Sequence, residues 1–144
     1  KIKDLTVFVD DWDTWSQHTE FYKTSDISFS PAIIGSARFG YNPLKNLRFT
    51  LSGKYVSRQY IDNSSSVERS LDPYKVFDLG AEYVLKPKFV KEVAFRLTLR
   101  NVLSEEYESN AWVYLYYYGG AHYVLDGYFP QAYMNWLGSV NVKF

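Results

Sequence analysis

The stretch that decides the fold is MNWLGSVNVKF, residues 134–144. Every second residue from Met134 to Phe144 is apolar or glycine, and the residues between them are polar except for Leu137. A period of two residues places successive side chains on opposite faces of a β-strand. The stretch therefore predicts a strand with one apolar and one polar face. The apolar row includes the last residue, where chain ends of soluble proteins are usually polar, so this face needs a nonpolar neighbour.

The same alternation occurs in four more stretches and, more weakly, in a fifth. The four stretches cover residues 27–41, 47–58, 77–85 and 93–99, and the weaker one covers residues 2–9. No segment shows a 3.6-residue period. We therefore expect an all-β, antiparallel chain of about six strands that forms one domain, residues 1–144.

The connections between these stretches alternate in length. Residues 42–46 (NPLKN) and 86–92 (KPKFVKE) are short, whereas the connections at about 60–75 and 103–133 are long. All short turns would then lie at one end of the sheet and all long loops at the other. Transmembrane β-barrels have this asymmetry, with short periplasmic turns and long extracellular loops. Counting strands back from Phe144 places the C-terminus on the periplasmic side.

Alternation alone is typical of both a membrane barrel and a soluble β-sandwich, because each has one apolar face. Three features favour the barrel. The strands run to about ten residues, which suits the ~9–11 residues of a tilted membrane strand. Aromatic residues lie at both ends of the apolar rows, as in the girdles of outer-membrane barrels. The polar rows carry charges of both signs, which suits a watery lumen: Arg38, Arg48, Lys54, Arg58, Asp78, Glu82, Arg96 and Arg100.

Composition excludes several classes of function. The 16 basic and 16 acidic residues cancel, so no net charge draws the chain to nucleic acid, and the absence of cysteine excludes disulfides and thiolate metal sites. His18 and His122 fall in predicted loops, and no nucleophile or phosphate-binding motif is present, so we expect no enzyme, cofactor or metal site. Asp10, Asp11 and Asp13 offer a possible Ca²⁺ cluster, but they lack the glycine and distal glutamate of an EF-hand, and a solvated outer loop is favoured.

Three motifs resemble the closing segments of TonB-dependent outer-membrane receptors. They are YIDNSSSVERSLDPYKVFDL (60–79), RNVLSEEYESNAW (100–112) and DGYFPQAYMNWLGSVNVKF (126–144). The resemblance extends over essentially the whole chain and implies the last part of a barrel of about 22 strands. The plug domain and the motif that engages TonB have no counterpart here. About six strands are too few for a membrane barrel, which begins at about eight, so we expect an open sheet, with the rest of the barrel outside this sequence.

The resemblance implies a function and a set of partners. It implies a cell outer-membrane receptor that binds and actively imports a scarce nutrient, such as a siderophore, cobalamin, oligosaccharide or peptide. The implied partners are outer-membrane lipid, the remainder of the barrel, the plug, TonB through the plug, the barrel-assembly machinery and a surface lipoprotein. Two other classes stay open: a passive porin or other outer-membrane barrel, including a barrel enzyme, and a soluble carbohydrate-binding β-sandwich.

Two groups of residues are candidate sites. The terminal strand resembles the signal read by the barrel-assembly machinery, and its lipid-facing residues would be Trp136, Val140, Val142 and Phe144. The second group lies in NAWVYLYYYGGAHYVLDGYF (110–129), where one tryptophan and six tyrosines precede or follow a predicted Gly119-Gly120 turn. Aromatic faces with hydroxyl tips can stack on a ligand or pack one loop on another. The hypothesis is that Trp112, Tyr116 and Tyr118 line a ligand-capturing vestibule; the alternative is a packing hairpin.

Overall fold

The computed structural model describes residues 1–144, and the chain is all-β, as expected. None of its helical segments is long and apolar enough to span a membrane. The elements are β1 (Ile2–Asp11), β2 (Ser16–Ser25), β3 (Ile34–Leu44), β4 (Leu47–Val56), β5 (Gln59–Tyr60), the 3₁₀ turn η1 (Val67–Arg69), β6 (Ser70–Leu71), β7 (Tyr74–Leu85), β8 (Glu92–Arg100), β9 (Glu108–Tyr118), β10 (Ala121–Pro130) and β11 (Asn135–Lys143).

The expected count of about six strands is wrong, since the chain has eleven. The predicted long loops contain strands of their own: β5 and β6 lie in the first, and the hairpin β9–β10 lies in the second. Strand β2 was not predicted, and β3 begins at Ile34 rather than at residue 27. Strands β2 and β9 were not recognised because neither alternates between polar and apolar residues: β2 is largely polar on both faces, and β9 is largely apolar on both.

The chain forms two compact units. The first unit comprises residues Lys1–Ala32, Ser57–Pro73 and Tyr107–Gln131, and the second comprises Ile33–Val56, Tyr74–Glu106 and Ala132–Phe144. We call them the hairpin unit and the sheet unit. The expectation that residues 1–144 form one domain stays a prediction.

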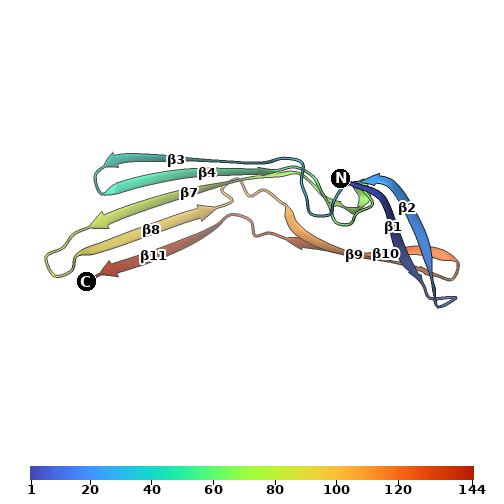
Figure 1. Ribbon diagram of the computed structural model, residues 1–144. Coiled ribbons are helices and arrows are strands. Elements are labelled where there is room, and N and C mark those ends of the chain that lie inside the picture. The colour runs from blue at the N-terminus through green and yellow to red at the C-terminus, as the bar shows by residue number, and fades with distance from the viewer. The chain divides into compact units, whose positions relative to one another are not determined.

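The sheet unit is an open antiparallel sheet of five strands in the order β3-β4-β7-β8-β11 (Figure 1). Every strand pairs with the strand that precedes or follows it in this unit, and β3 and β11 each lack a second neighbour. The register aligns like with like: Phe39, Leu51, Leu79 and Leu99 form one apolar row across four strands. The expectation of an open sheet is confirmed.

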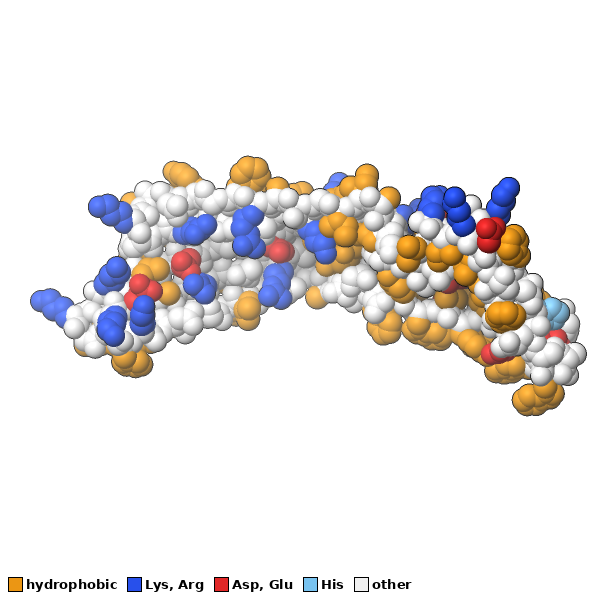
Figure 2. All heavy atoms as spheres, viewed as in Figure 1, with side chains coloured by type: hydrophobic (Ala, Val, Ile, Leu, Met, Phe, Trp, Pro, Cys, Tyr) orange, Lys and Arg blue, Asp and Glu red, His pale blue; other side chains and the backbone are white.

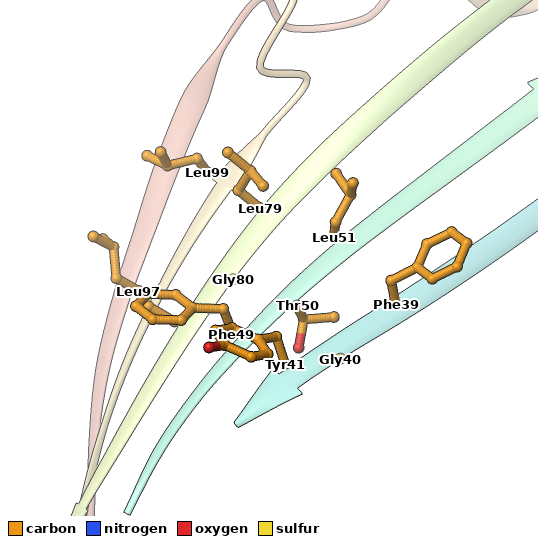
Figure 3. A pocket seen from close by; sticks show the side chains of 11 residues that line it. Phe39, Gly40, Tyr41, Phe49, Thr50, Leu51, Leu79, Gly80, Leu97 and Leu99 are labelled. Atoms are coloured by element: carbon orange, nitrogen blue, oxygen red, sulfur yellow. The ribbon is translucent and has the colours of Figure 1, made fainter. Parts of the chain in front are cut away.

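One face of the sheet unit is apolar and has no protein cover. Side chains on this face project to the same side of β3, β4, β7 and β8 (Figure 3). Leu51, Leu97 and Val140 remain 41%, 45% and 60% exposed, so no residue of the sheet unit forms a second layer over them. In a β-sandwich these positions would face a second sheet about 10 Å away.

The hairpin unit is a four-stranded sheet in the order β10-β9-β1-β2. Strands β1–β2 and β9–β10 are antiparallel hairpins, and β1 meets β9 through a short parallel contact at Asp10–Asp11 and Tyr116–Tyr117. A small core of Ile61, Leu71 and Ala111, with Val113 against it, lies between β9 and the segment that carries β5 and β6. This unit therefore buries part of its apolar surface within itself.

A polar cluster accompanies that core. The Tyr22 hydroxyl donates to Glu20 Oε2 at 2.5 Å, and Arg69 Nε donates to Asp62 Oδ2 at 2.6 Å. Burial, together with the neighbouring Glu20 carboxylate, raises the pKa of Tyr22 to about 12. Because the folded chain holds this proton more tightly than the unfolded chain, whose tyrosine pKa is about 10, Tyr22 contributes stability below pH ~10 that is lost as the pH rises to about 12.

We expect the free energy of unfolding of the hairpin unit to fall between about pH 10 and 12, and the fall to be smaller in Tyr22→Phe. Chemical denaturation at several alkaline pH values, followed by tyrosinate absorbance, measures both quantities. Tyr133→Phe is the matched control, because Tyr133 lies in the sheet unit and bonds a different carboxylate, Glu106. Equal pH dependence in the parent and in Tyr22→Phe would contradict the assignment.

Candidate functional site

The apolar face of the sheet unit contains a shallow hollow of about 350 Å³ (Figure 3). Its lining is almost wholly apolar, with Phe39, Phe49 and Leu97 around Gly80. The predicted assembly residues lie at the β11 edge of the sheet. Trp136, Val140 and Val142 alternate on one face of β11, Phe144 follows its end, and all are exposed: their neighbours on β8 are Leu99, Phe95 and Val93.

The opposite face of the sheet unit is polar and charged (Figure 2). Arg96 Nε donates to Glu82 Oε2, and Asp78 Oδ1 accepts the backbone N–H of Asn101 at 2.9 Å. Lys54 Nζ lies 5.9 Å from the centre of the Tyr74 ring, within reach of a cation–π contact. The polar row thus forms a partly paired network.

One residue of the expected polar row lies elsewhere. Arg58 belongs to the hairpin unit, where its guanidinium pairs with Asp72 at 3.1 Å. The predicted strand 47–58 ends at Val56, and the chain then turns into β5, so the alternation does not continue to position 58.

The hairpin unit contains a row of stacked aromatic rings on one face. The Tyr116 ring stacks on Trp12 at 4.7 Å, on Tyr123 at 5.2 Å and on Tyr114 at 5.7 Å between ring centres. Tyr116 is the centre of this row, and its neighbours come from β9, from β10 and from the β1–β2 turn. Rings that stack on one another present their edges, not their faces, to a ligand.

The three predicted ligand-binding residues share one face of β9, because they lie at even positions of the strand. Their surroundings differ. The Tyr116 ring is covered by its stacking partners, whereas Trp112 and Tyr118 are 48% and 56% exposed. A Cβ at Gly127 would lie only 2.3 Å from Trp112 Nε1, so the indole rests against the backbone of β10 and turns its other side outward. Of the three, Trp112 is the best placed to stack on a ligand.

The other face of the same hairpin carries residues that the sequence did not bring together. The Tyr117 ring lies between His18 at 4.2 Å and His122 at 4.7 Å between ring centres. The expectation that both histidines lie in loops is wrong, since they belong to β2 and β10. The aromatic row also includes three rings that were not among the predicted site residues: Trp12, Tyr114 and Tyr123. The spacing of two residues between Tyr114 and Tyr116 could have indicated that these two rings share one face of a strand.

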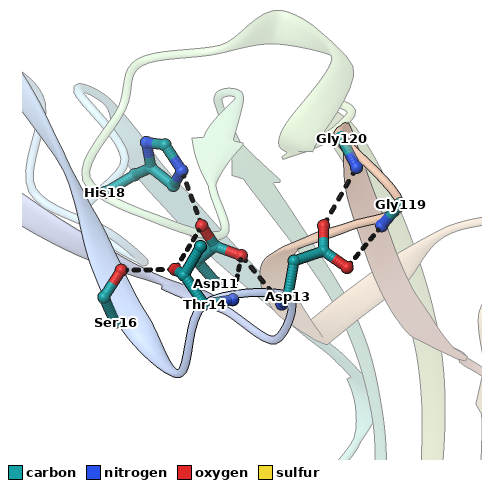
Figure 4. Close-up of polar contacts among 7 residues, drawn as sticks. All are labelled: Asp11, Asp13, Thr14, Ser16, His18, Gly119 and Gly120. Carbon is teal, nitrogen blue, oxygen red and sulfur yellow. Dashed lines mark hydrogen bonds and ion pairs between the residues drawn. The ribbon is translucent and has the colours of Figure 1, made fainter.

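The tips of the two hairpins are joined by Asp13 (Figure 4). Its two carboxylate oxygens accept the backbone N–H groups of Gly119 and Gly120, each at 2.9 Å. Both glycines have positive φ, +60° and +73°, as the expected tight turn between β9 and β10 requires. The Asp13 bonds therefore depend on the conformation that only this Gly-Gly turn presents.

The neighbouring carboxylates are used in other bonds. The Asp11 carboxylate accepts a hydrogen bond from the Thr14 hydroxyl at 2.8 Å, and this bond lowers the pKa of Asp11. Asp11 Oδ2 also lies 3.1 Å from His18 Nε2. The Asp10 carboxylate accepts hydrogen bonds from Gln17 Nε2 at 3.0 Å and from the Tyr114 hydroxyl at 2.9 Å. Both bonds lower the pKa of Asp10, the Gln17 bond more strongly. No three His, Asp or Glu side chains converge so that they could hold a metal ion. These carboxylates fix the hairpin tips.

Compared with protein-family models, with curated protein sequences and with solved structures, the chain matches none. The resemblance of its closing motifs to TonB-dependent receptors therefore stays a prediction, as do the partners and the localisation that it implies.

Replacing Asp13 by asparagine should loosen the joined tips. The amide can accept only one of the two N–H groups well and carries no charge, so hydrogen exchange at Gly119 and Gly120 should be about tenfold faster. Amide exchange followed by mass spectrometry or NMR measures this. Asp4→Asn is the control, because Asp4 lies on the same hairpin, forms no ion pair and has a positive φ that asparagine tolerates. Unchanged exchange would show that Asp13 does not hold the tips.

Replacing Gly127 by alanine should displace the Trp112 indole, because the new methyl group would overlap it. The cost should be about 1 kcal/mol, at the low end for overpacking, because the indole can move outward. The emission of Trp112, taken as the difference from a Trp112→Phe background, should shift to longer wavelength. Gly35→Ala is the control, since a Cβ there meets nothing within 4 Å. An unchanged emission would mean that Trp112 does not rest on Gly127.

Proposed function

We propose that this chain is the closing part of the β-barrel of a TonB-dependent outer-membrane receptor, which binds a scarce nutrient outside the cell and imports it with energy delivered through TonB. The supporting observation is the pair of unlike faces on the open sheet. Apolar side chains such as Leu51, Leu97 and Val140 are exposed on one face, while Arg48 and Arg96 lie on the other. A contiguous exposed apolar surface on this scale marks contact with lipid or with another protein.

The edges of the sheet point to the same surroundings. Strands β3 and β11 each leave one row of backbone N–H and C=O groups without a partner strand. In a lipid bilayer every such group must be paired, which only a helix or a closed barrel achieves. In this proposal β11 pairs with the first strand of the complete barrel and β3 with a strand that precedes it, and the closed barrel has no edge.

The ends of the strands set the proposed orientation. The β3–β4 and β7–β8 connections are short, and both lie at the same end of the sheet, next to the end of β11. The connections from β4 to β7 and from β8 to β11 run through the hairpin unit. Short turns face the periplasm and long connections face outward in such barrels. The C-terminus is then periplasmic, and the hairpin unit belongs to the outer loops, with Trp112 as its ligand-stacking residue.

Two alternatives differ from this proposal in definite ways. A soluble carbohydrate-binding sandwich requires a second layer over the apolar face, and the sheet unit supplies none. A passive porin or another outer-membrane barrel would have the same sheet, and the receptor is preferred over it because of the motifs at residues 60–79, 100–112 and 126–144. In the proposed receptor this chain gives barrel wall, outer loops and the assembly signal; the plug, the barrel-assembly machinery and a surface lipoprotein are its partners.

Spin labels on adjacent residues of β8 test the proposal. These 144 residues contain no cysteine, so, once any cysteine elsewhere in the complete protein has been replaced, single labels can be attached at Leu97→Cys and Arg96→Cys in its membrane. If the apolar face contacts lipid, the label at position 97 collides mainly with dissolved oxygen, which concentrates in lipid, and the label at 96 collides mainly with a water-soluble nickel complex. In a sandwich the label at 97 would be shielded from both reagents, and that result would exclude the membrane barrel.

A further inference from the structure

The polar face of the sheet unit contains a recess of about 490 Å³ with a layered lining. Three successive rows of residues cross the strands here. The first row is Arg38, Ser52 and Asp78, with Arg100 beside it; the middle row is Gly40, Thr50, Gly80 and Thr98; the third row is Arg48, Glu82 and Arg96. Charged side chains thus stand on both sides of a floor made of glycine and threonine.

The glycines keep this floor low. A Cβ at Gly40 would lie 3.2 Å from a terminal nitrogen of Arg48, so the guanidinium lies across β3 at a position that a side chain would crowd. A Cβ at Gly80 would meet Thr50 only at 3.6 Å, an ordinary contact. A side chain at Gly80 would therefore meet no tight contact at its Cβ, and the glycine leaves this part of the floor without a side chain.

The recess has an excess of positive charge. Its lining contains four arginines and two carboxylates, which gives the recess a formal net charge of +2. Glu82 is already paired with Arg96, and Asp78 accepts the Asn101 N–H. Arg38, Arg48 and Arg100 form no ion pair in the chain. Guanidinium groups enclosed with so little counter-charge require anionic partners once water is displaced from the face.

We propose that this recess docks an acidic polypeptide segment that presents two carboxylates, one to each row of arginines. The rows pass through Asp78 and Glu82, four residues apart on β7, which is about 13 Å at ~3.3 Å per residue. A small anion would span only one row, whereas an extended segment with acidic residues four positions apart reaches both. Arginine suits this role because its planar fork binds carboxylates through two parallel bonds.

This inference rests on the proposed function, because it takes the polar face as the lining of a barrel lumen. The occupant is then a segment of the plug that fills the barrel, and the charges of the recess define its chemistry.

Photo-crosslinking at neighbouring positions separates the two claims. p-Benzoylphenylalanine is placed at Thr98, on the recess floor, or at Leu97, on the apolar face, in the complete protein in its membrane, and the linked partner is identified by mass spectrometry. We expect the Thr98 probe to link to a peptide with acidic residues near four-residue spacing and the Leu97 probe to link to lipid. A probe at Thr50, also on the floor, repeats the test if the Thr98 variant does not assemble.

The charges are then reversed. In Arg48→Glu/Arg96→Glu the Thr98 cross-link should fall by about tenfold or more, since losing one charge-assisted bond already changes an equilibrium by that factor. Replacing the acidic residues of the linked segment by lysine should restore it. A neutral or basic linked segment, a yield that is insensitive to the reversal, or no floor cross-link while Leu97 links to lipid would overturn the inference alone. Lipid at Thr98, or protein at Leu97, would overturn the proposed function with it.

Discussion

The sheet unit depends on the segregation of apolar and charged side chains to opposite faces of one layer of strands. Burying an apolar row such as Phe39, Leu51 and Leu79 away from water would lower its free energy, yet no residue of the sheet unit covers it. A register shift of one residue would exchange the faces on the strand that moved, placing an arginine among leucines. The strict alternation therefore disfavours every register shift by an odd number of residues, and it keeps Arg48, Glu82 and Arg96 on the far side.

Much of the sheet unit could be predicted from period two alone, because β4, β7, β8 and β11 each have one apolar and one polar face. Of the hairpin unit, only β1, as a weak strand over residues 2–9, and the Gly119-Gly120 turn could be predicted. Strand β2 is largely polar on both faces. In β9 the aromatic side chains of Trp112, Tyr114 and Tyr116 alternate with the apolar side chains of Val113 and Leu115, so β9 shows no alternation of polar and apolar residues. The parallel contact of β1 with β9 joins residues about a hundred positions apart, which no local pattern encodes.

The aromatic site shows the same limit at the level of single rings. The sequence grouped Trp112, Tyr116 and Tyr118 in one long loop, whereas the structure places them on one face of β9. Which ring is open to a ligand depends on residues remote in sequence. The Trp12 ring stacks on Tyr116, and the absence of a side chain at Gly127 leaves room for the Trp112 indole against the β10 backbone. Spacing predicts the face, whereas long-range packing decides which rings remain accessible.

The two units satisfy their polar and apolar groups in different ways. In the hairpin unit Asp13 bonds the Gly119-Gly120 turn, and a small core packs between β9 and the segment that carries β5 and β6, so part of its polar and apolar surface is satisfied within the chain. In the sheet unit an apolar face, a surplus of arginine and two strand edges all remain without partners. In the proposed barrel, lipid would cover the apolar face, acidic side chains would pair with the arginines and further strands would pair with the two edges. Since unpaired edges cannot enter lipid and unmatched guanidinium groups cannot be enclosed cheaply, the stability of the sheet unit would then depend on the assembled barrel rather than on these strands alone.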